Sequence, residues 1–219
     1  MKVVIFGASG MIGQGLLREC LLDPGVERVL SVVRKPTAAS HAKLTEIVHS
    51  DFSNHSAIES QLAGLDAGFF SVGVTSAGMN EADYRRITYG YTLAAAQTLA
   101  RLNPSMTFIY VSAAGADSSE KGRLMWARVR GETENAVLRL PFRAAYVFRP
   151  AVVIPLHGIQ SRTAWYRVLY KIIGWALPAI KLIAPGFVAT TEQMGRAMLK
   201  TARHGAPRRI LESRDIQHV

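Results

Sequence analysis

The stretch Gly7-Ala8-Ser9-Gly10-Met11-Ile12-Gly13 decides the fold of this chain. It follows the apolar run Val3 to Phe6, which has the length and composition of a strand buried on both faces. From Met11 to Leu22 the apolar residues recur at helical spacing, and Asp23-Pro24-Gly25 ends that helix. A G-x-x-G-x-x-G turn between a strand and a helix predicts a pyrophosphate site, since the helix N-terminus offers unpaired N–H groups.

Beyond the turn, short apolar strands continue to alternate with helical stretches. Further strands are expected over Val29 to Val33, Leu44 to Val48, Ala67 to Val72, Met106 to Ser112 and Ala144 to Phe148, with a continuation of the last to Ile154 left open. Helices are expected over Glu81 to Leu102 and Lys121 to Leu140. Such alternation builds right-handed βαβ units with a parallel sheet. We therefore predict an α/β fold, a Rossmann-type doubly wound parallel sheet.

The segment after Pro155 differs, because it shows no clear strand until Arg209 to Leu211. We expect a small helical C-terminal cap over residues 156–190, inserted in a single NAD(P)-binding domain of residues 1–219. Residues 164–183 are almost wholly apolar. The residues of this stretch that are not apolar recur at helical spacing and would form one polar stripe on a helix: Arg167, Lys171, Gly174, Pro178 and Lys181. A cap or core helix, a homodimer contact, an acidic membrane surface and a membrane span all remain open for this stretch.

Composition limits the partners and the compartment. The 219 residues are 49% hydrophobic, enough for a sizeable core, and their net charge of +10 favours anionic partners, although a basic solvated surface would carry the same charge. The sequence has no helix-turn-helix, zinc or stacking motif, so nucleic acid is not expected as a partner, and no His/Cys cluster predicts a metal. The single Cys20 and the short apolar run before Gly7 predict a cytoplasmic protein, with peripheral membrane attachment left open.

Arg34 and Lys35 follow the second strand, where sites for NAD usually carry an acid that binds the ribose 2′-OH. Two cations suit a 2′-phosphate instead, and Ser9 in the turn could donate to it. The sequence therefore favours NADP over NAD. Arg34 could instead stack on the adenine, in which case either cofactor would bind.

The ends of later strands place further residues near the cofactor. Asp51, in His49-Ser50-Asp51-Phe52, could accept from the adenine amino group, or it could cap a turn or a short helix. Gly73 follows the fourth strand and permits close approach of the backbone to the cofactor's middle. In the first 73 residues, the residues predicted to contact the cofactor are Gly7, Ser9, Gly10, Met11, Ile12, Gly13, Arg34, Lys35, Asp51, Phe52 and Gly73.

With these pieces assembled, the chain resembles the extended and atypical branches of the short-chain dehydrogenase/reductase superfamily, including epimerase/dehydratase-like and Tat-interacting-protein-like oxidoreductases. The likeness is carried by Thr107-Phe108-Ile109-Tyr110-Val111-Ser112, Arg130-Gly131-Glu132-Thr133-Glu134, Phe148-Arg149-Pro150 and the late stretch 190–197. It covers residues 1–150 best. The resemblance implies a catalytic Ser at the end of the fifth strand, which Ser112 matches, and a Tyr-x-x-x-Lys pair on the next helix.

Trp126 and Arg130 stand where that pair is expected, four residues apart on one helix face. An indole N–H donates only and does not titrate, so Trp126 is no general acid. Arg130 could hold the nicotinamide ribose hydroxyls, but it stays charged. His157, after the sixth strand, could supply the proton or be an ordinary loop histidine. Three tyrosines on the helix after the fourth strand are expected mainly to pack: Tyr84, Tyr89 and Tyr91.

Two functions remain on this reading. The first is an NADP(H)-dependent oxidoreductase in which Ser112 polarises an unidentified small-molecule substrate and Arg130 holds the ribose. Acceptors such as a flavin or a quinone would remove the need for a protein acid. The second is an NADP(H)-binding redox sensor or partner-binding module without turnover.

Overall fold

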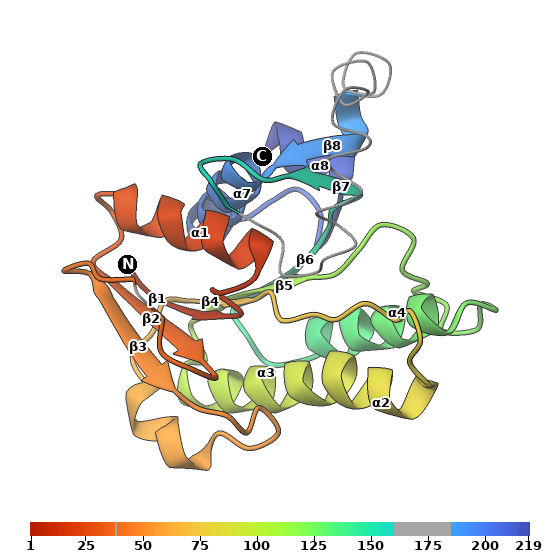
Figure 1. The fold of residues 1–219 in the computed structure, drawn as a ribbon, viewed down its shortest axis with the longest axis horizontal. Helices are drawn as coiled ribbons and strands as arrows, with labels where there is room; N and C mark the ends of the chain where they lie inside the picture. The colour runs from red at the N-terminus through yellow and green to blue at the C-terminus, as the bar shows by residue number, and fades with distance from the viewer. Residues whose placement is uncertain (38, 160–184) are drawn as a thin grey trace.

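The computed structural model describes residues 1–37, 39–159 and 185–219. Its main sheet has seven strands in the order β3-β2-β1-β4-β5-β6-β9, and all neighbouring strands are parallel (Figure 1). These strands are β1 (Lys2–Phe6), β2 (Arg28–Val33), β3 (Leu44–Val48), β4 (Ala67–Phe70), β5 (Thr107–Val111), β6 (Ala144–Arg149) and β9 (Ile210–Glu212). The strand order reverses between β1 and β4, which is where doubly wound sheets bind ligands. The predicted α/β Rossmann-type sheet is confirmed.

Helices cover both faces of the sheet (Figure 1). One face carries α1 (Met11–Leu22), α7 (Thr191–His204) and α8 (Ser213–His218). The other carries α2 (Glu81–Arg85), a π-helical turn (Arg86–Gly90), α3 (Tyr91–Leu102), α4 (Met125–Leu138) and a 3₁₀ helix (Ser56–Gln61). Because successive side chains of a strand point to opposite faces, Val3 and Ile5 pack toward α1 while Val4 and Phe6 pack toward α3.

The late helix α7 begins at a capping box. Thr190 Oγ1 accepts from the Gln193 backbone N–H at 3.1 Å, and Gln193 Oε1 accepts from the Thr190 N–H at 2.9 Å. Met194 and Met198 of this helix join the core beneath α1. The stretch 190–197 therefore belongs to a helix that packs beside α1, as the sequence likeness implied, and continues to His204.

Two predicted elements differ in the structure. Pro150, which has no N–H to donate, separates β6 from β7 (Val152–Ile154), and β7 pairs with β8 (Val188–Thr190) in a second, two-stranded sheet. The cap assigned to residues 156–190 is therefore not helical throughout: a 3₁₀ turn, Pro185–Phe187, precedes β8. The helix expected from Lys121 begins at Met125 instead.

That later start has a local cause. The carboxylate of Asp117 accepts from the backbone N–H groups of Ser119, Lys121 and Gly122 and keeps them in a loop. The apolar stretch 164–183, with its cap, dimer and membrane alternatives, lies outside the described residues. Within the ranges that the structure describes, no helix has both the length and the hydropathy of a membrane span.

Candidate functional site

The glycine turn lies at the carboxyl end of β1 and has the geometry that the spacing predicts. Gly7 has φ +90°, and a Cβ there would lie 2.8 Å from the Val72 nitrogen. A Cβ on Gly13 would lie 2.0 Å from the Gly7 carbonyl oxygen, so both positions require glycine. The Gly10 N–H closes the turn on the Gly7 oxygen at 2.9 Å.

The start of α1 is open to an anion. Its N-cap, Gly10, has no side chain to cap the helix, and no acidic residue lies in the first turn, which holds Met11 and Ile12. The first N–H groups of a helix have no partner within it. The turn and this helix end together can bind a pyrophosphate.

A pocket of about 270 Å³ lies beside the turn. It is lined by Ala8, Ser9, Gln14, Leu17, Ser31, Thr37, Ala39 and Glu46. Arg34 and Lys35 are exposed nearby in the chain, and neither makes an ion pair with another described residue. The pocket lies between the glycine turn and the segment after β2, where the cofactor's adenosine ribose is expected.

Glu46 of this pocket was missed by sequence reasoning. The acid was sought at the end of β2, whereas Glu46 comes from the neighbouring strand β3, opposite Ser31 in the register. Only the strand pairing brings it beside Ser9, and the hydrophobic pattern of β3 contains no sign of it. The register of two predicted parallel strands is the one signal that could have found it.

The Asp51 carboxylate caps the turn that follows β3, which is one of the roles left open above. The Asp51 carboxylate accepts from the Ser53 N–H at 2.9 Å and from its hydroxyl, and these bonds lower the pKa of Asp51. Phe52 is buried with its ring edge-on to Phe6, 6.1 Å between ring centres. Phe52 thus packs the end of β3 against the end of β1. The contact of Asp51 with the adenine amino group stays a prediction.

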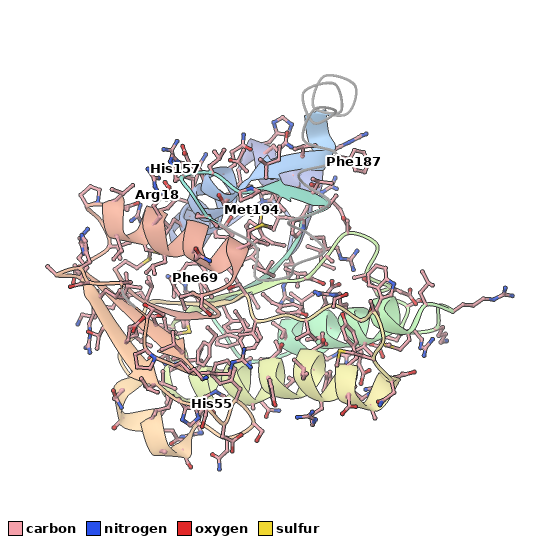
Figure 2. The ribbon with its side chains drawn as sticks, in the orientation of Figure 1. Arg18, His55, Phe69, His157, Phe187 and Met194 are labelled. Atoms are coloured by element: carbon pink, nitrogen blue, oxygen red, sulfur yellow. The ribbon has the colours of Figure 1, made fainter. Side chains whose placement is uncertain are left out.

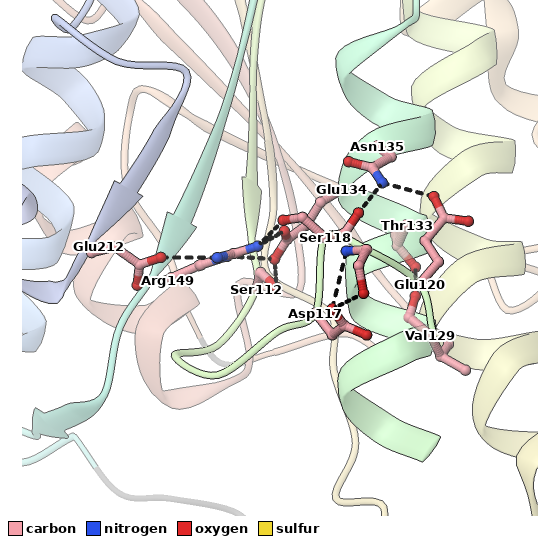
Figure 3. Close-up of polar contacts among 11 residues, drawn as sticks. Ser112, Asp117, Ser118, Glu120, Val129, Thr133, Glu134, Asn135, Arg149 and Glu212 are labelled. Atoms are coloured by element: carbon pink, nitrogen blue, oxygen red, sulfur yellow. Dashed lines mark hydrogen bonds and ion pairs between the residues drawn. The ribbon is translucent and has the colours of Figure 1, made fainter. Parts of the chain in front are cut away.

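Ser112 follows β5, where the family likeness puts a catalytic serine, and its hydroxyl donates to the carboxylate of Glu134 on α4 (Figure 3). Glu134 is fully buried and forms an ion pair with Arg149, whose Nε lies 3.1 Å from its carboxylate. Arg149 Nη1 reaches Glu212 at 2.9 Å. Ser112 is therefore tied to a buried network that joins α4, β6 and β9.

Arg130 lies at the same edge of the sheet as Gly73, and its Nη2 would be 3.8 Å from a Cβ on that glycine. Its Nε donates to the Tyr84 hydroxyl at 3.0 Å. Tyr110 is buried beside them, its hydroxyl interacts with Ser112, and burial raises the pKa of Tyr110 to about 12. The structure thus brings Gly73, Arg130 and Ser112 to one site through two buried tyrosines. Sequence reasoning treated Tyr84 as packing and did not single out Tyr110.

Trp126 packs near this site against the loop before α4. Its ring would lie 3.2 Å from a Cβ on Gly115, which has φ +85°. The position where the family likeness implies a tyrosine is thus filled by an indole ring, which has no titrating group.

The contact described for His157 is with α7. Its Nε2 is 2.7 Å from Glu192 Oε2 at the start of α7 (Figure 2 labels His157). The preceding Leu156 N–H donates to Thr191 Oγ1 at 3.1 Å, which draws this loop over α7. The described contacts of His157 include neither Ser112 nor Arg130, so its role as a proton donor stays a prediction.

A model of the NAD(P)H-binding family matches residues 7–140. The chain belongs to this NAD(P)H-binding family. The match spans the glycine turn, the pocket beside it, Ser112 and Arg130, and it confirms the resemblance to atypical short-chain dehydrogenases and reductases.

Curated relatives add a second line of evidence. Protein fmp52, mitochondrial, of Aspergillus clavatus is 32% identical over 202 residues, which cover 90% of this chain and 84% of the relative. Protein FMP52, mitochondrial, of Candida albicans is 27% identical over 172 residues, 75% of this chain and 74% of the relative. Both names place these relatives in mitochondria. The expectation of a cytoplasmic protein, drawn from Cys20 and the N-terminal run, is therefore contradicted.

Solved structures share the fold. The Bordetella bronchiseptica enzyme WbmH, in complex with NAD⁺, is 15% identical with a TM-score of 0.69 and covers 96% of this chain and 74% of its own. A UDP-N-acetylglucosamine 4-epimerase from Methanobrevibacter ruminantium is 14% identical with a TM-score of 0.70 and covers 96% of this chain and 75% of its own. At these identities the likeness shows the Rossmann-type fold alone.

Proposed function

We propose that the chain is an NADP(H)-binding oxidoreductase of the atypical short-chain dehydrogenase/reductase type. The observation that carries this is the Gly7–Gly13 turn, packed so closely that Gly13 tolerates no Cβ, at an uncapped helix end. Arg34 and Lys35, exposed and without ion pairs among the described residues, favour a 2′-phosphate and hence NADP(H) over NAD(H).

Arg130 supports hydride transfer by orientation. With its Nε bonded to Tyr84, the guanidinium can direct its two Nη groups at the nicotinamide ribose hydroxyls. The dinucleotide supplies the hydride when it is bound. Ser112 can polarise the substrate only if its hydroxyl turns away from Glu134, to which it now donates.

Trp126 in the place of the family's tyrosine favours one class of substrate. Trp126 cannot donate a proton to a nascent alkoxide, and the described contacts of His157 are elsewhere. Acceptors that stabilise the incoming electron pair themselves, such as a flavin or a quinone, fit this site better than a simple ketone.

A second candidate function has its own support. Trp126 in the place of the tyrosine and the Ser112–Glu134 bond both favour a dinucleotide-binding sensor or partner-binding module without turnover. A contact with a membrane surface or with a second copy through residues 164–183 remains part of that prediction.

The test is a fluorescence titration with NADPH and NADH, followed by addition of flavins, quinones and aldehydes while the reduced nicotinamide absorbance is followed. Tighter binding of NADPH, with oxidation by an acceptor that Ser112→Ala or Arg130→Met abolishes, supports the enzyme. Tight binding with no oxidation by any acceptor in the panel favours the sensor. If neither nucleotide binds, both functions fail.

A further inference from the structure

We propose that Glu46 limits the preference of this chain for NADP(H) over NAD(H), an inference that rests on the proposed dinucleotide binding. Glu46 lies on β3 and lines the pocket of about 270 Å³ together with Ser9 of the glycine turn and Thr37. It is a half-buried carboxylate in a chain whose segment after β2 is otherwise cationic.

The pocket has the position of the cofactor's ribose 2′ group. Ala8 and Ser9 form one wall, Gln14 and Leu17 of α1 form another, and the segment that follows Arg34 and Lys35 closes it. In dinucleotide-binding sheets the ribose 2′ group lies between the glycine turn and the end of the second strand. A group that lines this pocket would therefore lie next to either a 2′-hydroxyl or a 2′-phosphate.

Thr37 fixes the Glu46 carboxylate. The Thr37 backbone N–H donates to Glu46 Oε2 at 2.9 Å and its hydroxyl donates to Oε1 at 2.5 Å. These bonds hold the carboxylate in one position and keep the segment after Arg34 close to β3. Each carboxylate oxygen retains a further lone pair that can accept from a ligand.

The two cofactors meet this carboxylate differently. A ribose 2′-hydroxyl can donate to Glu46, as it does to the acid at the end of the second strand in ordinary NAD sites. A 2′-phosphate is repelled by the same charge, and Arg34 and Lys35 oppose that repulsion. The attraction of the 2′-phosphate to Arg34 and Lys35 thus exceeds its repulsion by Glu46, and this repulsion weakens the preference for NADP(H).

Ser31 is the independent sign that the pocket receives a polar group. It lies opposite Glu46 in the strand register, it is fully buried, and its Oγ has no hydrogen-bond partner among the described residues. Buried hydroxyls are almost always hydrogen-bonded in folded proteins. A ligand group in the pocket, or a water that accompanies it, would satisfy Ser31.

The experiment compares NADPH and NADH dissociation constants for the wild type and Glu46→Gln by fluorescence at low ionic strength. Glutamine keeps an oxygen for Thr37 and removes the charge, so the ratio Kd(NADH)/Kd(NADPH) should rise about five- to tenfold. Glu59→Gln is the matched control: it changes the net charge equally, but Glu59 pairs with Arg101 on the other face of the sheet. Its ratio should equal that of the wild type.

Two further variants keep the test decisive. Glu46→Asp retains the charge and should keep the wild-type ratio, and Glu46→Thr, neutral and suited to a strand, replaces the glutamine variant if that one does not fold. An unchanged ratio in the neutral variants overturns the role of Glu46 while the proposed function stands. Failure of the wild type to bind either nucleotide overturns both.

Discussion

Arg130 on α4 donates its Nε–H to the hydroxyl of Tyr84 on α2, with 3.0 Å between the two atoms. Tyr84 is 1% exposed, so its hydroxyl holds one side of the guanidinium from inside the protein. Gly73, near the start of the loop that follows β4, lies close to Nη2 of the same guanidinium, 3.8 Å from a Cβ built on the glycine. The side chain that stands in place of the family's lysine is thus oriented by a buried tyrosine.

Tyr84→Phe should weaken NADPH binding about three- to tenfold, because one hydrogen bond that orients a charged group is lost, a loss of about 1 kcal/mol. The affinity for adenosine 2′,5′-bisphosphate, which lacks the nicotinamide half, should not change. Fluorescence and calorimetric titrations measure the two ligands. Tyr89→Phe is the control, since Tyr89 contacts Arg85 instead. Equal losses for both ligands would show that Tyr84 only supports the fold.

Glu134→Gln should destabilise the protein by about 3 kcal/mol, since it removes the fully buried carboxylate that faces the guanidinium of Arg149. The Glu212 carboxylate, still paired with Arg149, keeps the loss from being larger. Urea unfolding gives the value. Glu212→Gln breaks only the half-exposed pair and should cost less than about 1 kcal/mol. A loss in Glu134→Gln as small as that in Glu212→Gln would contradict the structural role of the network.

Gly13→Ala should abolish NADPH binding or prevent folding, because its Cβ would overlap the Gly7 carbonyl oxygen at 2.0 Å. Gly10→Ala should retain the turn, since its Cβ would meet that same oxygen at 3.3 Å. Circular dichroism shows whether each variant folds, and the NADPH titration measures the affinity of the variants that do. Wild-type affinity in Gly13→Ala would contradict the geometry of the turn.

The parts of the site that the sequence could predict are those that depend on neighbours in the chain. The turn at Gly7 to Gly13 needs only the strand before it and the helix after it, and β3 (Leu44–Val48) shows in its own pattern. Glu46, by contrast, becomes a candidate only because β3 pairs in parallel with β2. The three residues of β8 form a strand only because they pair with β7. Tyr110 and Glu134 likewise become functional candidates only when β5 and α4 pack together.

His55 is buried with both ring nitrogens unpartnered among the described residues, in a cluster with Phe6, Phe52 and His49. Burial, reinforced by the neighbouring His49, lowers the pKa of His55 from 6.5 to about 4. The imidazole is therefore neutral in the folded protein at neutral pH. In the unfolded chain it takes up a proton below its ordinary pKa of 6.5.

Stability should therefore fall as the pH is lowered from about 7 to about 4, because the unfolded state binds the proton first, and His55 should contribute up to about 3 kcal/mol of that loss. Below pH 4 both states are protonated and this contribution stops changing. His55→Phe, which suits the aromatic cluster, should match the wild type within about 1 kcal/mol at pH 7 and exceed it by about 2–3 kcal/mol at pH 4. Urea unfolding of the two proteins across this pH range measures the difference between their free energies of unfolding. The same carboxylates titrate in both proteins, so their contribution cancels in that difference. A difference that stays constant with pH would mean that His55 titrates alike in both states.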